Sequence, residues 1–526
     1  MRADGNIVEL LDKGARCCSG CFAAGNDRSR CYGSHLDGES SMRRNKVTVR
    51  LTGIPLAAVL AASTAWAAPP VLVSGPSPYA ACSIAGQPGT NYLNAEVEPW
   101  LAVNPAHSDN LIGAWQQDRW SNGGARGLVA GFSFDGGATW GETTLPFNRC
   151  APGTPAELQY ERASDPWVSV GPDGTAYTVS ISFNATNNNN AVAAAVSTNG
   201  GHTWDNVSVL IADNEPGAQF FNDKESVTAN PVRAGEAYVV WDRLESPNDN
   251  PYANLHTAAF RGPTFFAKTV NGGRTWSAPK IIVDFTSSRK QTIGNQIVVD
   301  PRTGVLYDFF ALFTPPFGVS AYKVAFIKST DDGTTWTTPQ IIADLRTVTV
   351  TDPNTGEPLR TGDVIPEPAI DQATGQLYVV WQDSRFSSGQ FDEIALSTST
   401  DGGNSWSSPI RVNTPEGRPA FNPSVRVNTA GVVGVTYYDF RALPPGDTTT
   451  LPTNIWRTTS TNHGQSFDSE VHVAGSFDMK TAPISRGFFV GDYQGLDVMG
   501  TTFVPFFVQT NSGNTANRTD VFATKD

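Results

Sequence analysis

The sequence predicts an all-β protein, built as a β-propeller of four-stranded antiparallel blades. Three observations predict it. The composition combines 49 Gly, 36 Pro and 10% aromatic residues with only 17% charged residues, which favours short strands and many turns over a helical bundle. One octapeptide recurs six times at intervals of 60 to 72 residues. Two strand-like segments stand upstream of each copy in a fixed order.

The charge of the chain excludes two other classes of protein. The formal net charge is −13, so DNA or RNA would be repelled and nucleic-acid binding is not expected. The low charged fraction and the many Trp, Tyr and Phe residues exclude an intrinsically disordered chain. No basic or amphipathic tract indicates a membrane surface, and we expect no membrane span in the mature chain.

The first part of the sequence predicts an export signal. Residues 42–68 combine a basic start, an apolar run and a small-x-small site at Ala65-Trp66-Ala67, the pattern of a secretory signal peptide. We therefore expect a secreted protein, extracellular or periplasmic, after cleavage near Ala67. Residues 1–41 precede this signal, and we interpret them as a disordered upstream extension with Met42 as the true start.

Only two cysteines remain after the predicted cleavage, Cys82 and Cys150. In an exported protein they can form one disulfide, which would close a long loop and stabilise the fold by roughly 4 kcal/mol. Two buried free thiols are the alternative.

The octapeptide has the chemistry of a tight turn. Its copies are SFDGGATW, STNGGHTW, TVNGGRTW, STDDGTTW, STDGGNSW and STNHGQSF, starting at 133, 197, 269, 329, 399 and 460. Asp or Asn at the third position can bind backbone amides of its own loop, and Gly at the fifth position can adopt a positive φ. The final Trp or Phe packs the turn onto the sheet. The third-position residues are therefore predicted to be structural: Asp135, Asn199, Asn271, Asp331, Asp401 and Asn462.

Each copy lies in a unit of four predicted strands, with the octapeptide between the third and the fourth. One such sheet cannot bury both faces, so the units must pack side by side as propeller blades. A seventh unit has three strands near the C-terminus, and residues 69–75 can supply its fourth strand. We predict a single domain over 69–526 with seven blades, closed by pairing of the N- and C-terminal strands. Six blades are the alternative.

Octapeptides of the form S-x-D-x-G-x-T-W resemble the Asp boxes, or BNR repeats, of the sialidase (neuraminidase) superfamily. The resemblance covers nearly all of residues 69–526. It implies a secreted sialidase-like glycoside hydrolase that acts on extracellular glycans without a cofactor. It also implies a Tyr nucleophile assisted by a Glu, an Asp acid/base and three Arg that hold the substrate carboxylate. Where the family has an Arg-x-Pro motif, this chain reads Val97-Glu98-Pro99-Trp100, and a Glu there would repel a carboxylate.

The topology of a meander predicts where the site lies. The starts of first strands and the ends of second strands share one face, opposite the octapeptide turns. Ionisable and amide residues are frequent at both places. The starts carry Glu98, Asp165, Lys224, Glu225, Gln296, Glu367, Asn422, Asp492 and Tyr493, and the ends carry Asp118, Arg119, Asp242, Arg243, Asp383, Arg385, Asp439 and Arg441.

The resemblance assigns roles to some of these residues. Tyr493 would be the nucleophile, with Tyr437 and Tyr438 as the alternatives, and Glu367 or Glu225 would be its base. Asp165 would be the acid/base. The anion clamp would be formed by Arg243, Arg385 and Arg441, with Arg119, Glu98 and Asp492 also lining the binding site.

Four alternatives remain open. Two of the carboxylates at the first-strand starts or second-strand ends can carry out hydrolysis without the Tyr. The Asp and Arg residues at the second-strand ends can be salt bridges between blades. The same face can bind a glycan or a protein without catalysis. Calcium can bind within the carboxylates, although no motif demands a metal.

Overall fold

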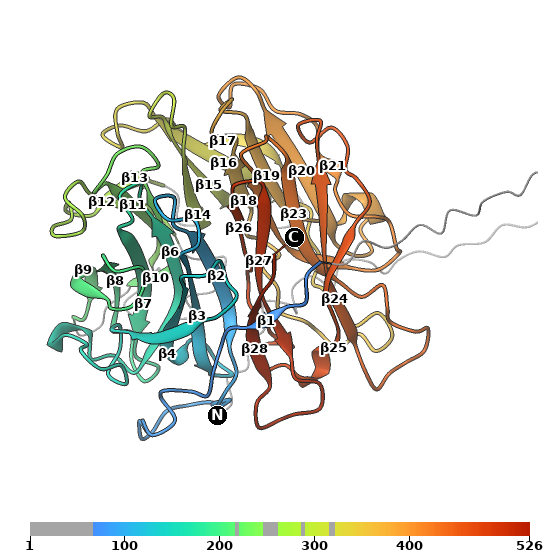
Figure 1. Cartoon of the computed structure of the whole chain (residues 1–526), viewed down its shortest axis with the longest axis horizontal. Coiled ribbons are helices and arrows are strands. Elements are labelled where there is room, and N and C mark those ends of the chain that lie inside the picture. The colour runs from blue at the N-terminus through green and yellow to red at the C-terminus, as the bar shows by residue number, and fades with distance from the viewer. Residues whose placement is uncertain (1–66, 216–219, 246–260, 286–289, 315–320, 526) are drawn as a thin grey trace, which may run out of the picture. The chain divides into compact units, whose positions relative to one another are not determined.

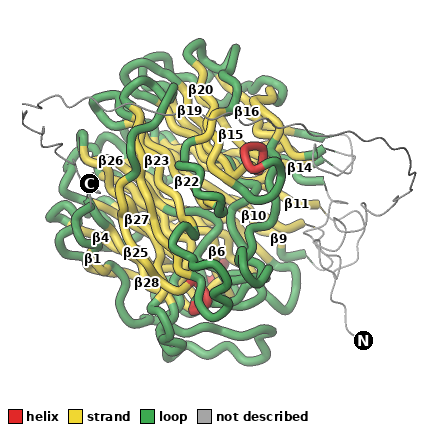
Figure 2. The backbone as a smooth tube through the Cα atoms, turned by 90° about the vertical axis from the view of Figure 1, so that its right-hand side faces the viewer, coloured by secondary structure: helices red, strands yellow, loops and turns green. Residues whose placement is uncertain are grey.

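The computed structural model describes residues 67–215, 220–245, 261–285, 290–314 and 321–525. The expected upstream extension and the signal peptide lie outside the described residues, apart from Ala67 and Ala68. The described chain is all-β, and the named strands pair in antiparallel ladders. Strands and loops make up nearly all of the backbone in Figure 2. In the described part, the helical segments are short 3₁₀ turns: η2 Ala156–Leu158, η3 Ser384–Ser387 and η4 Met479–Thr481. No helix there is long and apolar enough to span a membrane.

The first two units of the sequence form one eight-stranded sheet. Its strands are β2 Val97–Val103, β3 Leu111–Arg119, β4 Ala125–Ser133, β5 Gly141–Leu145, β6 Arg162–Val170, β7 Ala176–Phe183, β8 Asn190–Ser197 and β9 Asp205–Asp213. A single pair, Ala125 with Ala163, joins β4 to β6. Both are fully buried alanines, whose small side chains allow the two backbones to approach. The separate four-stranded sheets expected here are therefore linked.

The following units form four separate sheets of four strands, each in sequence order. The first two are β10 Phe220–Ala229, β11 Ala237–Glu245, β12 Thr264–Thr269 and β13 Lys280–Val283, then β14 Gln291–Val299, β15 Leu306–Phe313, β16 Tyr322–Ser329 and β17 Gln340–Asp344. The next two are β18 Glu367–Ile370, β19 Leu377–Asp383, β20 Glu393–Ser399 and β21 Ile410–Arg411, then β22 Ala420–Val427, β23 Val433–Asp439, β24 Pro452–Ser460 and β25 Val471–Asp478.

The last sheet contains both ends of the described chain. Its C-terminal strands are β26 Gly495–Met499, β27 Thr502–Thr510 and β28 Thr519–Ala523. The N-terminal strand β1, Val71–Leu72, pairs antiparallel with β28 through Val71–Ala523 and Leu72–Phe522. The strand order is β1-β28-β27-β26. In Figure 1 the blue N-terminal strand lies beside the red C-terminal strands. The N-terminal segment therefore supplies the fourth strand of this sheet and covers the edge of β28.

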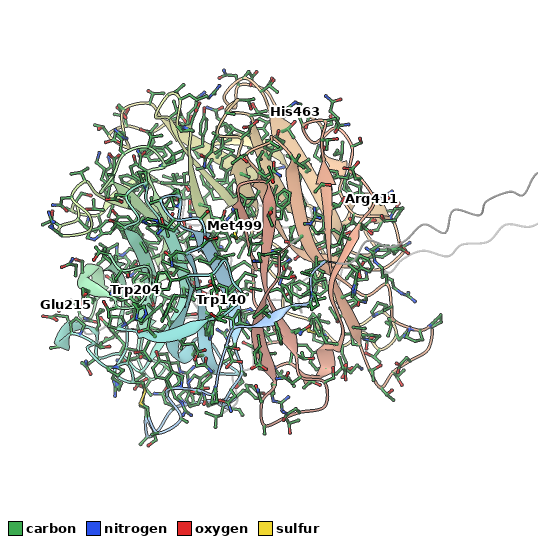
Figure 3. All side chains as sticks on the ribbon, viewed as in Figure 1. Trp140, Trp204, Glu215, Arg411, His463 and Met499 are labelled. Atoms are coloured by element: carbon green, nitrogen blue, oxygen red, sulfur yellow. A yellow bond between two sulfur atoms is a disulfide. The ribbon has the colours of Figure 1, made fainter. Side chains whose placement is uncertain are left out.

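The six octapeptides are the turns between the third and fourth strands of their units. In each, the third-position side chain accepts the backbone N–H four residues on, as in Asp135 from Thr139 at 2.9 Å and Asn271 from Thr275 at 3.0 Å. The aromatic residue contacts the preceding unit: Trp336 lies 5.6 Å from Phe266, centroid to centroid. Figure 3 labels Trp140 and Trp204 of the first two boxes and His463 of the sixth.

The fifth-position glycine of the box is needed for packing as well as for the turn. A Cβ on Gly273, at φ +72°, would lie 2.3 Å from Val196 on β8 of the preceding unit. A Cβ on Gly333 would lie 2.6 Å from Phe266, and a Cβ on Gly403 would lie 2.6 Å from Phe326. The neighbouring Gly272, at φ +73°, has open space around its missing Cβ. The fifth-position glycine therefore sets how closely consecutive units pack.

Neighbouring units touch through their first strands. The contacts run from β2 to β6, β10, β14, β18, β22 and β26, and β26 contacts β2 again. The hydrophobic core lies between the sheets, and one buried cluster contains Trp100, Trp167, Trp241 and Tyr493 from different units. The starts of the first strands are thereby brought close together.

Candidate active site

A repeated β-bulge shapes the start of the first strands. In β2, β6, β10, β14 and β22 the pairing with the second strand shifts register at the corresponding place. The first bulge residue has a positive φ in every case: Glu98 (55°), Asp165 (53°), Lys224 (49°), Gly294 (71°) and Asn422 (48°). This position usually carries Gly, and a residue with a Cβ is strained there. Bulges of this kind redirect side chains, and strained residues often lie at functional sites.

Three of these bulge residues meet a fourth from the last unit. The Nζ of Lys224 lies 2.8 Å from Asp492 Oδ2, 3.1 Å from Asp165 Oδ1 and 3.2 Å from Glu98 Oε1. We call these four residues the Lys224 cluster. At most 9% of any of these side chains is exposed. Three carboxyl groups therefore share one buried ammonium group. Because like charges repel in a buried site, ionising all three is unfavourable.

The environment separates the pKa values of the carboxyl groups. Burial raises the pKa of Glu98 to about 8, against the opposing charge of Lys224. Burial also acts on Asp165, but the ammonium of Lys224 brings its pKa below the ordinary value. The pKa of Asp492 is lowered well below the ordinary value, because the guanidinium of Arg360 and Lys224 together overcome its burial. Next to the cluster, burial and the charge of Asp165 raise the pKa of Asp223 to about 7.

A group of three arginines, Arg119, Arg360 and Arg486, adjoins the Lys224 cluster. Arg360 holds both oxygens of Asp492, at 3.0 and 2.5 Å. Arg119 and Arg360 lie over the ring of Phe489, at 4.7 and 4.4 Å from its centroid. Both also donate to Ser485 Oγ, at 3.3 and 3.4 Å.

The arginine group has unused hydrogen-bonding capacity. Arg119 is 2% exposed, and its Nε has no hydrogen-bond partner among the described residues. Burial and the charge of Arg360 lower the pKa of Arg119 to about 10. Arg486 is exposed and makes no ion pair with any residue that the structure describes. Its pKa is lowered chiefly by the neighbouring charge of Arg360. Three cations this close favour an anion between them.

Tyr493, the predicted nucleophile, is buried beside the Lys224 cluster. Its ring meets Trp167 and Trp100 edge-on, at 5.1 and 6.0 Å between centroids. Its hydroxyl donates to the carbonyl of Pro166 at 3.3 Å. Burial, followed by the charge of Glu98, raises its pKa well above the ordinary value. This setting disfavours the phenolate form.

The two predicted bases lie in different surroundings. Glu225 is 2% exposed, and neither of its carboxyl oxygens has a hydrogen-bond partner in the part of the chain that the structure describes. Burial, followed by the charge of Asp165, raises its pKa well above the ordinary value. Glu367 accepts from Ser424 Oγ at 2.6 Å and from Arg426 at 2.9 Å, and burial raises its pKa to about 7. Of the two, Glu225 is the one beside the cluster.

The three predicted clamp arginines pair with other carboxylates, away from the cluster. Arg243 pairs with Asp213, and Arg385 pairs with Asp383 two residues away. Arg441 pairs with Asp439 and with Glu470. The Arg243–Asp213 pair joins β11 to β9 of the preceding sheet, as the salt-bridge alternative expects. The pairs of Arg385 and Arg441 stay within their own units. Arg119, which was predicted to line the binding site, lies in the arginine group.

Other predicted residues lie away from the cluster. The box residues Asp135, Asn199, Asn271, Asp331, Asp401 and Asn462 bind their own turns. Cys82 and Cys150 form a disulfide with a Cα–Cα distance of 5.7 Å. In the described residues, no group of three His, Cys, Asp or Glu side chains is arranged to hold a metal ion. The cation that contacts the carboxyl groups of the Lys224 cluster is the ammonium of Lys224.

Sequence reasoning missed four charged residues at the site: Asp223, Arg360, Arg486 and Asp363. The pKa of Asp363 is raised by burial and then by the charge of Asp492. Asp223 directly precedes Lys224. Arg360 and Asp363 lie in the segment before β18, and Arg486 lies in the segment before β26. The topological rule that selected first-strand starts applies equally to the links that lead into them. Including those links would have covered Arg360, Asp363 and Arg486, whereas Asp223 lies in β10 itself.

No protein-family model matches the chain, and no curated protein matches it by sequence. Solved structures with some likeness include a Hadza microbial sialidase, at 15% identity and a TM-score of 0.45, covering 80% of this chain and 74% of that one. An α-L-arabinanase of Penicillium chrysogenum has 11% identity and a TM-score of 0.44, with 87% and 98% covered. A variant of the NanB sialidase from Streptococcus pneumoniae has 12% identity and a TM-score of 0.39, with 82% and 68% covered. We therefore infer function from the site itself.

Proposed function

We propose that this protein is a secreted glycoside hydrolase of the sialidase-like type, acting on extracellular glycans. We infer a seven-bladed propeller for it, because the contacts between first strands form a closed cycle of seven. The active site would lie at the starts of those strands, around the Lys224 cluster. The resemblance of the six boxes to Asp boxes supports the same proposal.

One observation carries the proposal: carboxyl groups in contact with one another have pKa values shifted in opposite directions. Asp223, with a pKa of about 7, keeps a proton near neutral pH, while the neighbouring Asp165 is ionised. Glycoside hydrolysis needs such a pair, one group to protonate the leaving oxygen and one to act as base or nucleophile. We assign Asp223 as the acid and Asp165 as its ionised partner.

The arginine group would bind an acidic substituent of the sugar. Arg486 is exposed and unpaired among the described residues, so it would meet an anion first. Within the described ranges, the Nε of Arg119 is free and the guanidinium has no carboxylate partner at hydrogen-bonding distance. A sialic acid or another acidic sugar fits this arrangement.

Tyr493 as nucleophile is the alternative within this proposal. Its burial and raised pKa favour the carboxyl pair instead. The variant Tyr493→Phe should therefore retain turnover. Tyr177→Phe is the matched control, because it also removes the hydroxyl of a buried tyrosine. Loss of turnover in Tyr493→Phe alone would restore the Tyr nucleophile.

The test is hydrolysis of a panel of aryl glycosides that includes sialosides and uronides. We expect wild-type turnover on an acidic sugar and a loss of about 10²- to 10⁴-fold in Asp223→Asn. Asp135→Asn should be as active as the wild type, because other boxes carry Asn at that position. Absence of turnover on every glycoside, or full activity of Asp223→Asn, would contradict the proposal.

A non-catalytic glycan-binding protein is the second candidate. It is favoured by the neutralisation of the Lys224 cluster, in which one ammonium contacts three carboxyl groups. Such a protein would bind acidic glycans through Arg486 without cleaving them. Binding to a glycan array, lost in Arg486→Ala and accompanied by no hydrolysis, would support this candidate.

A further inference from the structure

Asn422 occupies the same bulge position as three members of the Lys224 cluster, but it carries no charge. It is 2% exposed, with φ +48° on β22. A strained conformation at a buried amide requires compensating contacts. Its hydrogen bonds supply them.

The side-chain amide of Asn422 joins two segments that are far apart in sequence. Its Oδ1 accepts the N–H of Gly362 at 2.9 Å. Its Nδ2 donates to the carbonyl of Gly491 at 2.7 Å. Gly362 lies two residues after Arg360, and Gly491 directly precedes Asp492. The side-chain amide of Asn422 thus links the segment that carries Arg360 to the segment that carries Asp492.

The backbone of Asn422 is held as firmly as its side chain. Its N–H donates to Gln382 Oε1 at 2.9 Å, and its carbonyl accepts from Gln494 Nε2 at 2.6 Å. Gln382 also reaches Thr361 Oγ1 at 3.2 Å, in the same segment as Arg360. The backbone N–H, the backbone carbonyl and both polar atoms of the Asn422 side chain therefore all take part in hydrogen bonds.

The two joined segments pack without spare space. A Cβ on Gly362 would lie 1.7 Å from the carbonyl oxygen of Asp492. A Cβ on Gly491 would lie 2.8 Å from the backbone N of Glu98. A small movement of either segment would therefore displace Arg360, Asp492 or Glu98. Because the double hydrogen bond from Arg360 to Asp492 is directional, such a movement would weaken it.

We propose that Asn422 is a positioning residue, whose amide fixes the Arg360–Asp492 pair against the Lys224 cluster. It contacts neither the reacting groups assigned above nor any charged side chain through its own amide. The proposal rests on the proposed function only in treating Arg360 and Asp492 as site residues.

The experiment measures the reaction of arginine side chains with phenylglyoxal, site by site, by mass spectrometry of the full mature chain. In Asn422→Gly, which tolerates the positive φ but lacks the amide, labelling of Arg360 should rise by about tenfold, the effect of losing roughly one net hydrogen bond. Labelling of the exposed Arg486 reports the reagent. Arg162, buried and bonded to Gln87, Pro88, Asn122 and Gly123, reports the overall fold.

Asn94→Gly is the matched control. Asn94 also has a positive φ, 52°, and its Oδ1 accepts one backbone N–H, from Ser77 at 2.9 Å. It should leave Arg360 labelling unchanged. If Asn422→Gly does not fold, Asn422→Asp retains the acceptor for Gly362 and lacks the donor to Gly491, and it should show a smaller rise at Arg360.

The labelling of Arg360 and Arg162 tests the positioning role. A rise at Arg360 with constant Arg162 supports the positioning role. No rise at Arg360, or an equal rise at Arg162, overturns it. If the wild type hydrolyses no glycoside while the rise at Arg360 persists, the proposed function fails and the positioning role stands.

Discussion

The two ends of the sheets use aspartate in opposite ways. At the box end, Asp135 is exposed, and the hydroxyl and N–H of Thr139 lower its pKa to about 2. At the other end, Asp223 and Asp242 are buried, and burial raises their pKa values to about 7 and 8. The box aspartate is satisfied by its own turn, whereas the site aspartates depend on residues of other units. Local hydrogen bonds therefore make a structural carboxylate, and long-range burial makes a reactive one.

The largest expected effect comes from removing the shared ammonium. Lys224→Met should destabilise the protein by about 3–5 kcal/mol at pH 7, because it leaves buried carboxylates unpaired. The loss should be smaller at pH 5, where the carboxyl groups take up protons. Urea unfolding at both pH values measures it. Lys328→Met, which removes an ammonium bonded to Gly402 and Asn404 near the boxes, is the control. Equal losses in the two variants would remove the distinction between the two ends.

The next effect tests the box end itself. Gly273→Ala should destabilise by about 2–3 kcal/mol, because the new methyl group collides with Val196 and the backbone has a positive φ. Gly272→Ala has the same φ without the collision, and should cost about 1 kcal/mol. Thermal unfolding compares them. Equal costs would show that the box glycine serves the turn alone.

A third prediction concerns pH. The folded-state pKa of Asp242, about 8, lies above its ordinary value of 3.8, chiefly through burial. The native state therefore holds a proton that the unfolded chain releases, and this stabilisation is complete below about pH 4 and lost as pH rises through 8. Each such group lowers stability by up to about 1.4 kcal/mol per pH unit in that window.

The corresponding variant is Asp242→Asn, which should flatten the fall in melting temperature between pH 4 and 8. The box carboxylates have lowered pKa values, so their contribution is present above about pH 4 and is lost as pH falls towards 2. Asp331→Asn should therefore change only the acid side of the curve. A fall between pH 4 and 8 that is as steep in Asp242→Asn as in the wild type would contradict the assignment.

The smallest effect is expected for exchanging the two kinds of box. In the Asn boxes the amide donates to the hydroxyl of the seventh residue, as Asn271 does to Thr275 at 2.8 Å. In the Asp boxes the hydroxyl donates instead, as Thr335 does to Asp331 at 2.6 Å. Rotation of the hydroxyl accommodates either case, so Asn271→Asp should shift the melting temperature by no more than about 2 °C. A larger shift would show that each box is adapted to its own third-position residue.

The strands and turns could be predicted because their signals are local. Alternating apolar residues, the box residues and the turn glycines all act within a few positions of the chain. The pairing of residues 71–72 with the C-terminal strands followed from counting the strands of the last unit. The bulges at Glu98, Asp165 and Lys224 did not follow, because a register shift depends on the partner strand as well as on the residue.

The site was only partly predictable, for a similar reason. Its carboxylates were found through topology, since first-strand starts converge. Its arginines were sought beside those carboxylates in the sequence, where Arg385 and Arg441 fold back on Asp383 and Asp439 two residues away. Arg360 and Arg486 come from links between units, whose paths no local pattern specifies.

By itself, the sequence determined the repeated antiparallel units, the box turns and the segment that completes the last sheet. Those features depend on backbone hydrogen bonding and on the burial of one face of each strand, which neighbouring residues settle. The tertiary structure decided which charges meet: Lys224 and Asp492 are 268 residues apart in sequence and 2.8 Å apart in space. Their pKa values follow from burial and from the distances between charges on different sheets, and these exist only once the sheets have packed.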